Sequence, residues 1–376
     1  MKVLIDENIS CIEQLFGNFD EVKKFYGRII SSKDLINVDA LIIRSITKVN
    51  KILLKNTSIK FIGTTTSGID HIDIQLLKSM NIYFSFAPGC NSIAVVEYVF
   101  SSILVLAERQ HFNLCDKIVG IVGVGNIGKI LLKRLTSLGI KCILCDPPRA
   151  VNENSKKFVS LSNIVKQADI ITLHAPLNLS DKYNTYHLMN LEHLSNLRDG
   201  AILINTSRGE LIDNKALLSL LIKGKKISVV LDVWEYEPKI NVDLLNLISI
   251  GTSHIAGYTF EGKTRGTIKI YEDYNNFFDR SFRRVSLLSL APKCVINEIT
   301  VNGKLTQEIL KRLIHLVYDV RSDDSNLRLV SDINNEFDQL RKNYKERREW
   351  SSLKVKCNFQ KTAILLNKLG FNACFK

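Results

Sequence analysis

The sequence predicts an α/β protein with doubly wound parallel sheets and a smaller α+β unit at its C-terminal end. Short hydrophobic runs alternate with helical patterns over the first hundred residues, a second alternating series begins at Lys117, and the pattern changes after about Ser286. Such alternation is typical of βαβ units, whose strands are parallel. A chain of 376 residues, 45% hydrophobic and 24% charged, is long enough for two or three domains.

The first series contains four expected strands separated by polar or amphipathic stretches: VLID, ALIIRS, KFIGTTT and NIYFSFA. A long apolar pattern then runs from Asn91 to Gln110, with Asn91 or Ser92 as its cap. We expect this segment to be a helix that joins two domains.

The second series contains six hydrophobic runs that end in small or polar residues: KIVGIVGVGNIG, KCILCDPP, ADIITLHAPL, GAILINTSRG, KISVVLDVW and SIGTSHIAGYT. Ligands of open α/β sheets bind outside the carboxyl ends of the strands. We therefore expect the ends of these runs to converge on one crevice: Gly123, Asp146, His174 to Pro176, Thr206 to Gly209, Asp232 and His254 to Tyr258. The region after Ser286, with TQEILKRLIHLVYDV as a helix, forms the smaller third unit.

The formal charge of +13 does not by itself indicate a nucleic-acid-binding protein, because the basic residues are spread along the chain. The start, MKVLIDENIS, lacks a secretory pattern, and no run of about 18 apolar residues suits a membrane helix. The eight cysteines are scattered in apolar contexts, which favours free thiols in a reducing compartment. We expect a cytoplasmic protein that binds neither membrane nor nucleic acid.

A glycine pattern, GxGxxG, lies between the strand GIVGV and the helix NIGKILLKRLTSLG, as a dinucleotide-binding loop requires. The next strand ends at Asp146, close to the expected offset of about 20 residues, where a carboxylate binds the adenosine ribose and repels a 2′-phosphate. The alternative is that Asp146 is a turn residue before Pro147. We favour NAD as cofactor, with these loop contacts: Gly123, Gly125, Asn126, Ile127 and Gly128.

Three residues at the ends of later strands could form a reaction centre. Arg208, in NTSRGE, offers a fork of donors to a substrate carboxylate. Glu237, in WEYEP, could pair with His254, in GTSHIAG, favour its protonated form and fix its orientation. The oxidation of a 2-hydroxy acid needs one base, and His254 is the candidate. Each residue also has a structural alternative: a surface arginine, a solvated glutamate or a histidine that caps a turn.

The remaining histidines do not suggest a metal site. His71 and His174 are positioned to line the crevice, but no pair in the sequence has metal-ligand spacing. We expect no metal.

These residues resemble the D-isomer-specific 2-hydroxy acid dehydrogenase family, through VGIVGVGNIGK, Asp146, NTSRGELID, LDVWEYEP and HIAGYT. Over essentially the whole chain, the sequence is similar to one branch of that family, through MKVLIDENI, ALIIRSITKVN, APGCNSIAVVEYVFSS, CDPPRA, HIAGYTFEGKTRGT, LRKNYKERREWSS and KLGFNA. The resemblance implies oxidation of 4-phospho-D-erythronate at C2, with NAD becoming NADH, in pyridoxal 5′-phosphate synthesis.

The resemblance also implies domains and site residues. The expected domains are a flavodoxin-like substrate domain (1–95 and 257–285), an inserted Rossmann NAD domain (96–256) and a C-terminal dimerisation domain (286–376). Arg208, Glu237 and His254 match catalytic positions. Substrate positions are matched by Ser45, Thr66 and Tyr258, and further NAD positions by Asp146, Ala175, Thr206, Asp232 and Gly257.

Several alternatives remain open. Ser253 replaces a usual proline, which would loosen the histidine loop, and Ser207 replaces a frequent cysteine. Arg347 and Arg348 could reach a substrate phosphate across a dimer, although solvent-exposed structural arginines are the simpler interpretation. D-3-phosphoglycerate dehydrogenase is a second enzyme hypothesis, to which the C-terminal segment fits less well. An NAD-sensing scaffold or corepressor with the same fold is a third hypothesis, because fold alone does not fix function.

Overall fold

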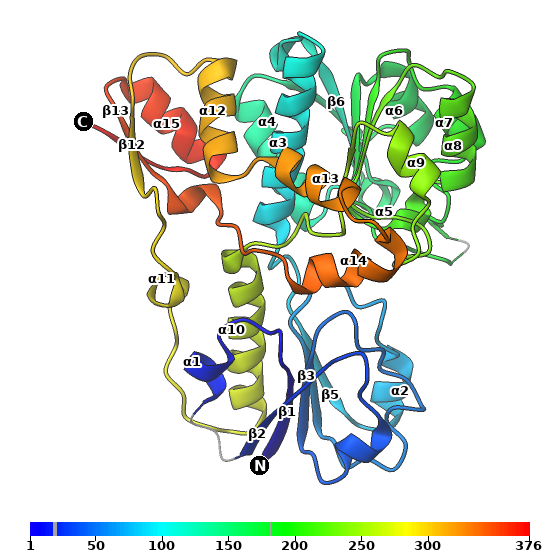
Figure 1. Cartoon of the computed structure of the whole chain (residues 1–376), viewed down its shortest axis with the longest axis vertical. Coiled ribbons are helices and arrows are strands. Elements are labelled where there is room, and N and C mark those ends of the chain that lie inside the picture. The colour runs from blue at the N-terminus through cyan, green and yellow to red at the C-terminus, as the bar shows by residue number, and fades with distance from the viewer. Residues whose placement is uncertain (18–20, 181) are drawn as a thin grey trace. The chain divides into compact units, whose positions relative to one another are not determined.

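The computed structural model describes residues 1–17, 21–180 and 182–376, and the chain divides into two compact units (Figure 1). The first unit consists of residues 1–91 and 258–293, and the second of residues 92–257 and 294–376. The chain therefore leaves the first unit near Asn91 and returns to it at Tyr258. In the part of the chain that is described, no helix is long and apolar enough to cross a membrane.

The first unit is built on a five-stranded parallel sheet with the flavodoxin-like order β2-β1-β3-β4-β5. Its strands are β1 (Lys2–Asp6), β2 (Glu21–Phe25), β3 (Ala40–Ile43), β4 (Phe61–Thr64) and β5 (Tyr83–Phe86). Its helices are α1 (Ile12–Phe16), α2 (Ile74–Ser79), α10 (Phe260–Phe277) and α11 (Leu287–Leu290), with the 3-10 helix η1 (Ser32–Leu35). The predicted alternation of strands and helices is confirmed.

Side chains that alternate along each strand fill the cores on the two faces of this sheet. Val3 and Ile5 of β1 face a cluster with helices α1 and α10, whereas Leu4 faces a cluster that contains Leu77 of α2. Burial on both faces explains why the strands are continuous hydrophobic runs in the sequence.

The second unit contains a six-stranded parallel sheet with the order β11-β10-β9-β8-β6-β7. These strands are β6 (Ile118–Val122), β7 (Lys141–Cys145), β8 (Ile170–Leu173), β9 (Ile202–Asn205), β10 (Ser228–Leu231) and β11 (Ile250–Gly251). Its helices are α3 (Ser92–Arg109), α4 (Asn126–Ser137), α5 (Pro147–Asn152), α6 (Leu161–Gln167), α7 (Leu191–Ser195), α8 (Asn214–Ile222) and α9 (Val242–Leu247), with η2 (Leu114–Asp116) and η3 (Gly209–Leu211). The predicted joining helix corresponds to α3, which is almost wholly buried.

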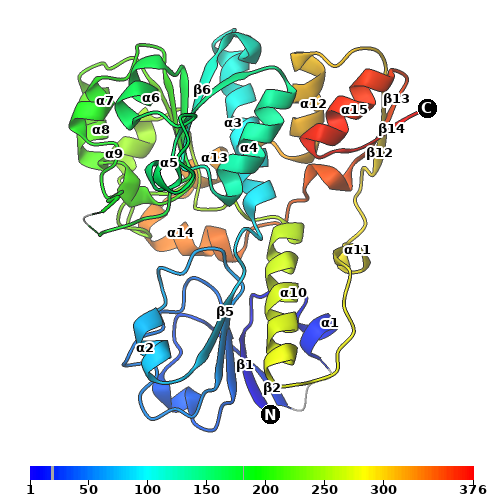
Figure 2. The same ribbon diagram turned by 180° about the vertical axis from the view of Figure 1, so that it is seen from behind.

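The C-terminal segment, residues 294–376, adds a third sheet to the second unit. Its parallel strands are β12 (Glu298–Val301), β13 (Lys354–Cys357) and β14 (Asn372–Phe375). Its helices are α12 (Gln307–Val317), α13 (Val320–Arg328), α14 (Ile333–Lys342) and α15 (Gln360–Leu369), with η4 (Trp350–Ser352). Helices α12 and α13 contact α3, and α15 contacts α4, as Figure 2 shows from behind. That this segment is a separate dimerisation domain stays a prediction.

Candidate active site

His254 and Glu237 form a close pair in the second unit. The ring Nδ1 of His254 lies 2.7 Å from Oε2 of Glu237, and Oε1 of Glu237 accepts a hydrogen bond of 2.9 Å from the backbone N–H of Trp234. The two residues lie on the loops after β10 and β11, which are neighbouring strands. The pairing predicted from two separate strand ends is therefore present in the structure, although their catalytic roles stay a prediction.

The electrostatics of the pair favour an ionised carboxylate. Burial opposes ionisation of Glu237, but the charge and hydrogen bond of His254, the charge of Arg341 and the hydrogen bond from Trp234 together hold the pKa of Glu237 below its usual value. An ionised Glu237 stabilises a proton on Nδ1 of His254. That leaves Nε2 as the ring atom able to accept a proton from a ligand.

Arg208 follows β9 and lines the same pocket as the pair. The side chain of Asn205 holds the turn, because its Nδ2 donates to the carbonyl of Arg208 (2.8 Å) and its Oδ1 accepts from the N–H (3.1 Å) and hydroxyl (2.9 Å) of Ser207. Ser207, which replaces a frequent cysteine, thus stabilises the turn that presents Arg208. The pocket has a volume of about 240 Å³ and is lined by Tyr186, Arg208, Gly209, Glu210, Trp234, Glu235, Tyr236, Glu237 and His254.

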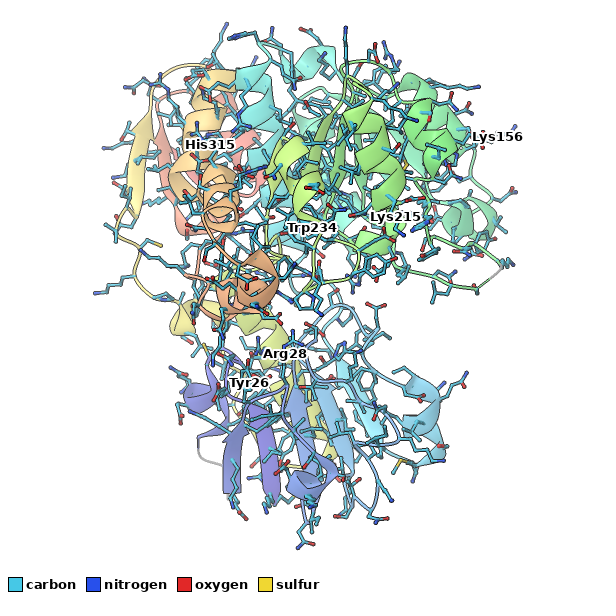
Figure 3. All side chains as sticks on the ribbon, turned by 45° about the vertical axis from the view of Figure 1, so that its right-hand side comes forward. Tyr26, Arg28, Lys156, Lys215, Trp234 and His315 are labelled. Atoms are coloured by element: carbon cyan, nitrogen blue, oxygen red, sulfur yellow. The ribbon has the colours of Figure 1, made fainter. Side chains whose placement is uncertain are left out.

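Asp232 organises the loop that carries His254. Its Oδ1 accepts from the N–H of Ile255 (2.8 Å) and the hydroxyl of Thr252 (2.6 Å), and its Oδ2 accepts from the N–H of Ala256 (3.0 Å). The indole of Trp234, labelled in Figure 3, donates to the carbonyl of Thr252 (2.9 Å). In the structure Asp232 is a buried acceptor that holds this loop, while the cofactor contact expected from the sequence stays a prediction.

The three glycines after β6 have three different surroundings. A Cβ on Gly123, at φ +86°, would lie 2.5 Å from the backbone nitrogen of Ala175, and one on Gly128 would lie 2.3 Å from the carbonyl oxygen of Gly123. Among the described residues, no atom lies within 4 Å of a Cβ built on Gly125, just before α4 begins at Asn126. Open space beside the first N–H groups of a helix suits a pyrophosphate. The loop therefore fits a dinucleotide.

Asp146 lies beside this loop at the end of β7. Its Oδ2 accepts a hydrogen bond of 2.8 Å from the N–H of Val124, and its Oδ1 accepts from the N–H of Arg149 as the cap of α5. The carboxylate is thus next to the glycine loop, where the sequence placed it, and it also holds that loop.

His174 and Thr206 are buried together at the ends of β8 and β9. Nδ1 of His174 lies 3.4 Å from the Thr206 hydroxyl, and Nε2 lies 2.9 Å from the Thr172 hydroxyl. Burial lowers the pKa of His174 to about 3, so the ring is neutral near pH 7. A neutral ring held by two hydroxyls is a structural element rather than a proton carrier.

The three predicted substrate residues lie in the first unit. Ser45 and Thr66 follow the neighbouring strands β3 and β4, where Ser45 is exposed and Thr66 is half-buried. The Thr66 hydroxyl contacts that of Thr64 (2.8 Å), which in turn lies 3.1 Å from Nε2 of His71. Tyr258 precedes α10, and the ammonium of Lys263 lies 4.8 Å from the centre of its ring.

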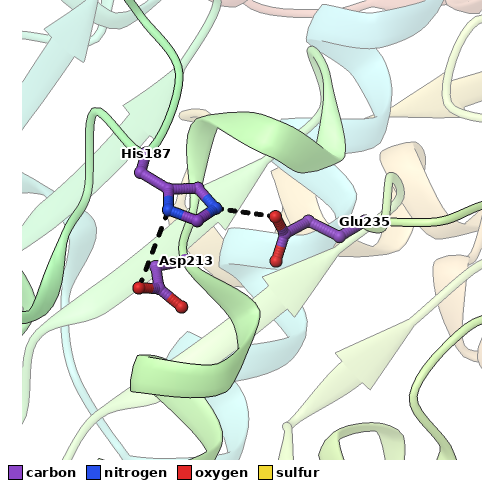
Figure 4. Close-up of side chains that lie close together, drawn as sticks. All are labelled: His187, Asp213 and Glu235. Atoms are coloured by element: carbon purple, nitrogen blue, oxygen red, sulfur yellow. Dashed lines mark hydrogen bonds and ion pairs between the residues drawn. The ribbon is translucent and has the colours of Figure 1, made fainter.

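A cluster that the sequence did not reveal lies beside the pocket. Nε2 of His187 is 2.7 Å from Oε1 of Glu235, and Nδ1 is 3.7 Å from Oδ2 of Asp213 (Figure 4). The other Glu235 oxygen accepts from the N–H of Asn214 (2.9 Å). These side chains are of types that can bind a cation, but both ring nitrogens already face carboxylates. We therefore interpret the cluster as a hydrogen-bonded network that holds the Glu235 side of the pocket.

The expectation of solvent-exposed arginines near the C-terminus is wrong for Arg347. It is buried, and its guanidinium donates to the carbonyls of Ala256 (2.5 Å) and Ala94 (3.3 Å). Arg348 is half-buried, with a contact of 2.9 Å to the thiol of Cys294. The burial of Arg347 comes from tertiary packing that the basic run RKNYKERREW does not reveal.

Comparisons with known proteins agree with this geometry. Residues 105–256 match the family model "D-isomer specific 2-hydroxyacid dehydrogenase, NAD binding domain", and residues 290–370 match a domain of unknown function (DUF3410). The chain is 56% identical to the erythronate-4-phosphate dehydrogenase of Proteus mirabilis over all of both chains. It is 55% identical to that of Escherichia coli K12, over 99% of this chain and 98% of the relative.

Solved structures show the same fold at lower identity. An NAD-bound 3-phosphoglycerate dehydrogenase from Entamoeba histolytica has a TM-score of 0.63 at 22% identity, over 74% of this chain and 95% of that chain. An NAD-bound formate dehydrogenase from Staphylococcus aureus has a TM-score of 0.60 at 24% identity, over 75% of this chain and 97% of that chain.

Proposed function

Because the chain belongs to the erythronate-4-phosphate dehydrogenase family of the D-isomer specific 2-hydroxyacid dehydrogenases, we propose that it oxidises 4-phospho-D-erythronate to (3R)-3-hydroxy-2-oxo-4-phosphooxybutanoate. The chain is an NAD-dependent dehydrogenase. The proposed reaction is a step of pyridoxal 5′-phosphate synthesis. The observation that carries the reaction type is the pocket that brings Arg208, Glu237 and His254 together.

In the proposed mechanism, His254 is the general base. Its Nε2 takes the proton of the C2 hydroxyl, while the ionised Glu237 at Nδ1 stabilises the imidazolium that forms. Bound NAD supplies the acceptor for the hydride that leaves C2. The product is a ketone, and His254 gives its proton to water after turnover.

Arg208 has the proposed role of holding the substrate carboxylate. A guanidinium fork matches a carboxylate with two parallel hydrogen bonds and so fixes the direction in which C2 faces. Ser45, Thr66 and Tyr258 are proposed to bind the remaining substrate oxygens through hydroxyl groups.

The proposed NAD contacts follow the carboxyl ends of β6 to β11. The loop of Gly123, Gly125, Asn126, Ile127 and Gly128 is proposed to bind the pyrophosphate at the start of α4. Asp146 is proposed to bind the adenosine ribose and to disfavour NADP by repelling its 2′-phosphate. The remaining proposed contacts are Ala175, Thr206, Asp232 and Gly257.

We also propose that the protein is a cytoplasmic homodimer that binds neither membrane nor nucleic acid. In the described chain all eight cysteines are free thiols, which suits a reducing compartment. The dimer is expected from the family resemblance, with residues 286–376 as its interface. Light scattering on the purified protein would measure its mass.

Purified protein is incubated with NAD and either 4-phosphoerythronate or 3-phosphoglycerate, and NADH absorbance is followed. In a parallel reaction a keto acid acceptor reoxidises any NADH that the enzyme retains, and the 2-oxo acid product is measured in place of NADH. We expect signal with 4-phosphoerythronate that is lost in His254→Ala. Equal or better turnover of 3-phosphoglycerate would refute the proposed substrate, and no turnover of either would favour the scaffold hypothesis.

A further inference from the structure

The backbone at His254 adopts a conformation that depends on its surroundings. His254 has φ +57°, in the left-handed region that L-residues with side chains rarely adopt. Such conformations persist only where surrounding contacts enforce them. The direction of the imidazole therefore depends on what holds the loop from Thr252 to Ala256.

Both backbone polar groups of Ala256, its N–H and its carbonyl, form hydrogen bonds with buried side chains. Its N–H donates to the buried carboxylate of Asp232 (3.0 Å). Its carbonyl accepts a hydrogen bond of 2.5 Å from the guanidinium of Arg347, which belongs to the C-terminal segment and is 91 residues away in sequence. The same guanidinium nitrogen donates to the carbonyl of Ala94 in α3 (3.3 Å). Arg347 thus fastens the end of the His254 loop to a buried helix.

Arg347 is itself fixed in place. The side chain stacks on the ring of Tyr318, with its guanidinium carbon 3.7 Å from the ring centre, and it lies 3.8 Å from Oδ2 of Asp323. That oxygen accepts hydrogen bonds of 2.8 Å from the hydroxyls of both Tyr318 and Tyr344. A buried cation with this many partners has little freedom to move away from Ala256.

The C-terminal segment also holds the strand that leads into the loop. β11 is an edge strand, and the N–H of Gly251 donates to Oδ1 of Asp324 in α13 (2.7 Å). Arg328 joins the same carboxylate (2.9 Å) and donates to the carbonyls of Leu245 and Ile248. An edge strand otherwise presents unpaired backbone groups. Asp324 of the C-terminal segment therefore accepts the backbone hydrogen bond that a neighbouring strand would otherwise accept.

Packing between the loop and the segment is incomplete. Ser253 and Ile255, which flank His254, line a cavity of about 290 Å³ together with Asp323 and Tyr344. A cavity therefore lies beside this part of the loop, and the polar contacts of Asp232 and Arg347 add to the restraint.

We propose that Arg347 is a positioning residue for catalysis, which holds the His254 loop through the carbonyl of Ala256. This gives the segment that matches a domain of unknown function an indirect part in the reaction, through the loop that carries the base. The inference deepens the proposed function and rests on it. Loss of Arg347 is expected to affect turnover more than the binding of substrate or cofactor, because the residue acts on the loop of the base.

The test uses Arg347→Met combined with Asp323→Asn in the full-length protein. The double variant avoids a buried, unpaired carboxylate, which would unfold the protein for an unrelated reason. The introduced asparagine side chain retains an oxygen that accepts from the tyrosine hydroxyls. The matched control is Arg312→Met, since the Arg312 side chain is 77% exposed in the same segment. Asp323→Asn alone is measured as the reference for the double variant. The readouts are kcat, KM, the Kd for NADH, and hydrogen exchange of peptides that cover residues 250–258.

We expect kcat of the double variant to fall at least tenfold, with KM and the NADH Kd within threefold of wild type. Exchange should accelerate in residues 252–257 and not across the second unit, and the Arg312→Met control should resemble wild type. Unchanged kcat and exchange would overturn the inference, and so would a uniform rise in exchange, which would show a role in general stability only. If wild type turns over neither substrate, the proposed function fails, while the exchange data still decide whether Arg347 holds the loop.

Discussion

Replacement of Glu237 with glutamine removes one negative charge from beside His254 and preserves most of the local contacts. A glutamine oxygen can still accept from the N–H of Trp234, as Oε1 of Glu237 does at 2.9 Å. The side-chain volume is nearly unchanged. The substitution therefore tests how much the charge, rather than the shape, contributes to proton transfer.

The geometry sets the expected magnitude. Two unit charges about 4 Å apart interact by ~4 kcal/mol at an effective dielectric constant of about 20. The side chains of His254 and Glu237 are 33% and 20% exposed, so we take about half of that value, ~2 kcal/mol, to allow for screening by water. About 1.36 kcal/mol corresponds to a tenfold change in rate, so Glu237→Gln should lower kcat about thirtyfold.

The assay is NADH formation at saturating 4-phosphoerythronate and NAD, with KM, NADH affinity and thermal denaturation measured on the same samples. We expect kcat to fall about thirtyfold while NADH affinity stays close to wild type and the variant remains folded. A kcat within threefold of wild type would refute it, because the carboxylate would then contribute no more than a neutral hydrogen bond.

Further substitutions test other parts of the site. Since the folded pKa of Glu237 lies below its ordinary 4.5, its ionised form stabilises the fold above that pH and the benefit is lost as pH falls through the folded value. The difference in urea unfolding free energy between wild type and Glu237→Gln should therefore shrink as pH falls below 4.5. Arg208→Lys keeps the charge but loses the fork, and KM for the substrate should rise about tenfold in steady-state assays. Asp146→Asn keeps an acceptor for Val124 but removes the charge, so the ratio of kcat/KM for NADP to that for NAD should rise at least tenfold. Gly209→Ala places a Cβ 1.9 Å from the carbonyl carbon of Trp234, and the free energy of unfolding should fall by ~3 kcal/mol or more in denaturant titrations.

Much of the fold could be predicted because buried parallel strands leave a clear mark in the sequence. ALII, IITL and ILIN are buried along their whole length, and each coincides with a strand. The residue that follows such a run lies at the carboxyl edge of the sheet, which is why Asp232 and the Arg208 turn could be located. The order of the strands in each sheet was harder to predict from the sequence, because it depends on which strands pair with each other and not on the residues within one strand.

The contacts that complete the site could not be predicted, because they join loops with no periodic pattern. His187 and Glu235 are 48 residues apart, and His187 is held at φ +49°, which no local signal indicates. In the sequence, Arg347 resembles the other cations of a basic run. Its burial depends on Tyr318 and Ala94, which lie far away in sequence.

The late position of α10 in the chain has a consequence for synthesis on the ribosome. The cluster around Val3, Ile5 and Phe61 is covered by Ile270 and Tyr274 of this helix, about 170 residues after β5 ends at Phe86. Translation adds ~5 to 20 residues per second, so α10 is synthesised roughly 10 to 35 seconds after β5. During that interval an apolar face is open to chaperones and to neighbouring nascent chains. The first strands to be translated are thus among the last to be packed.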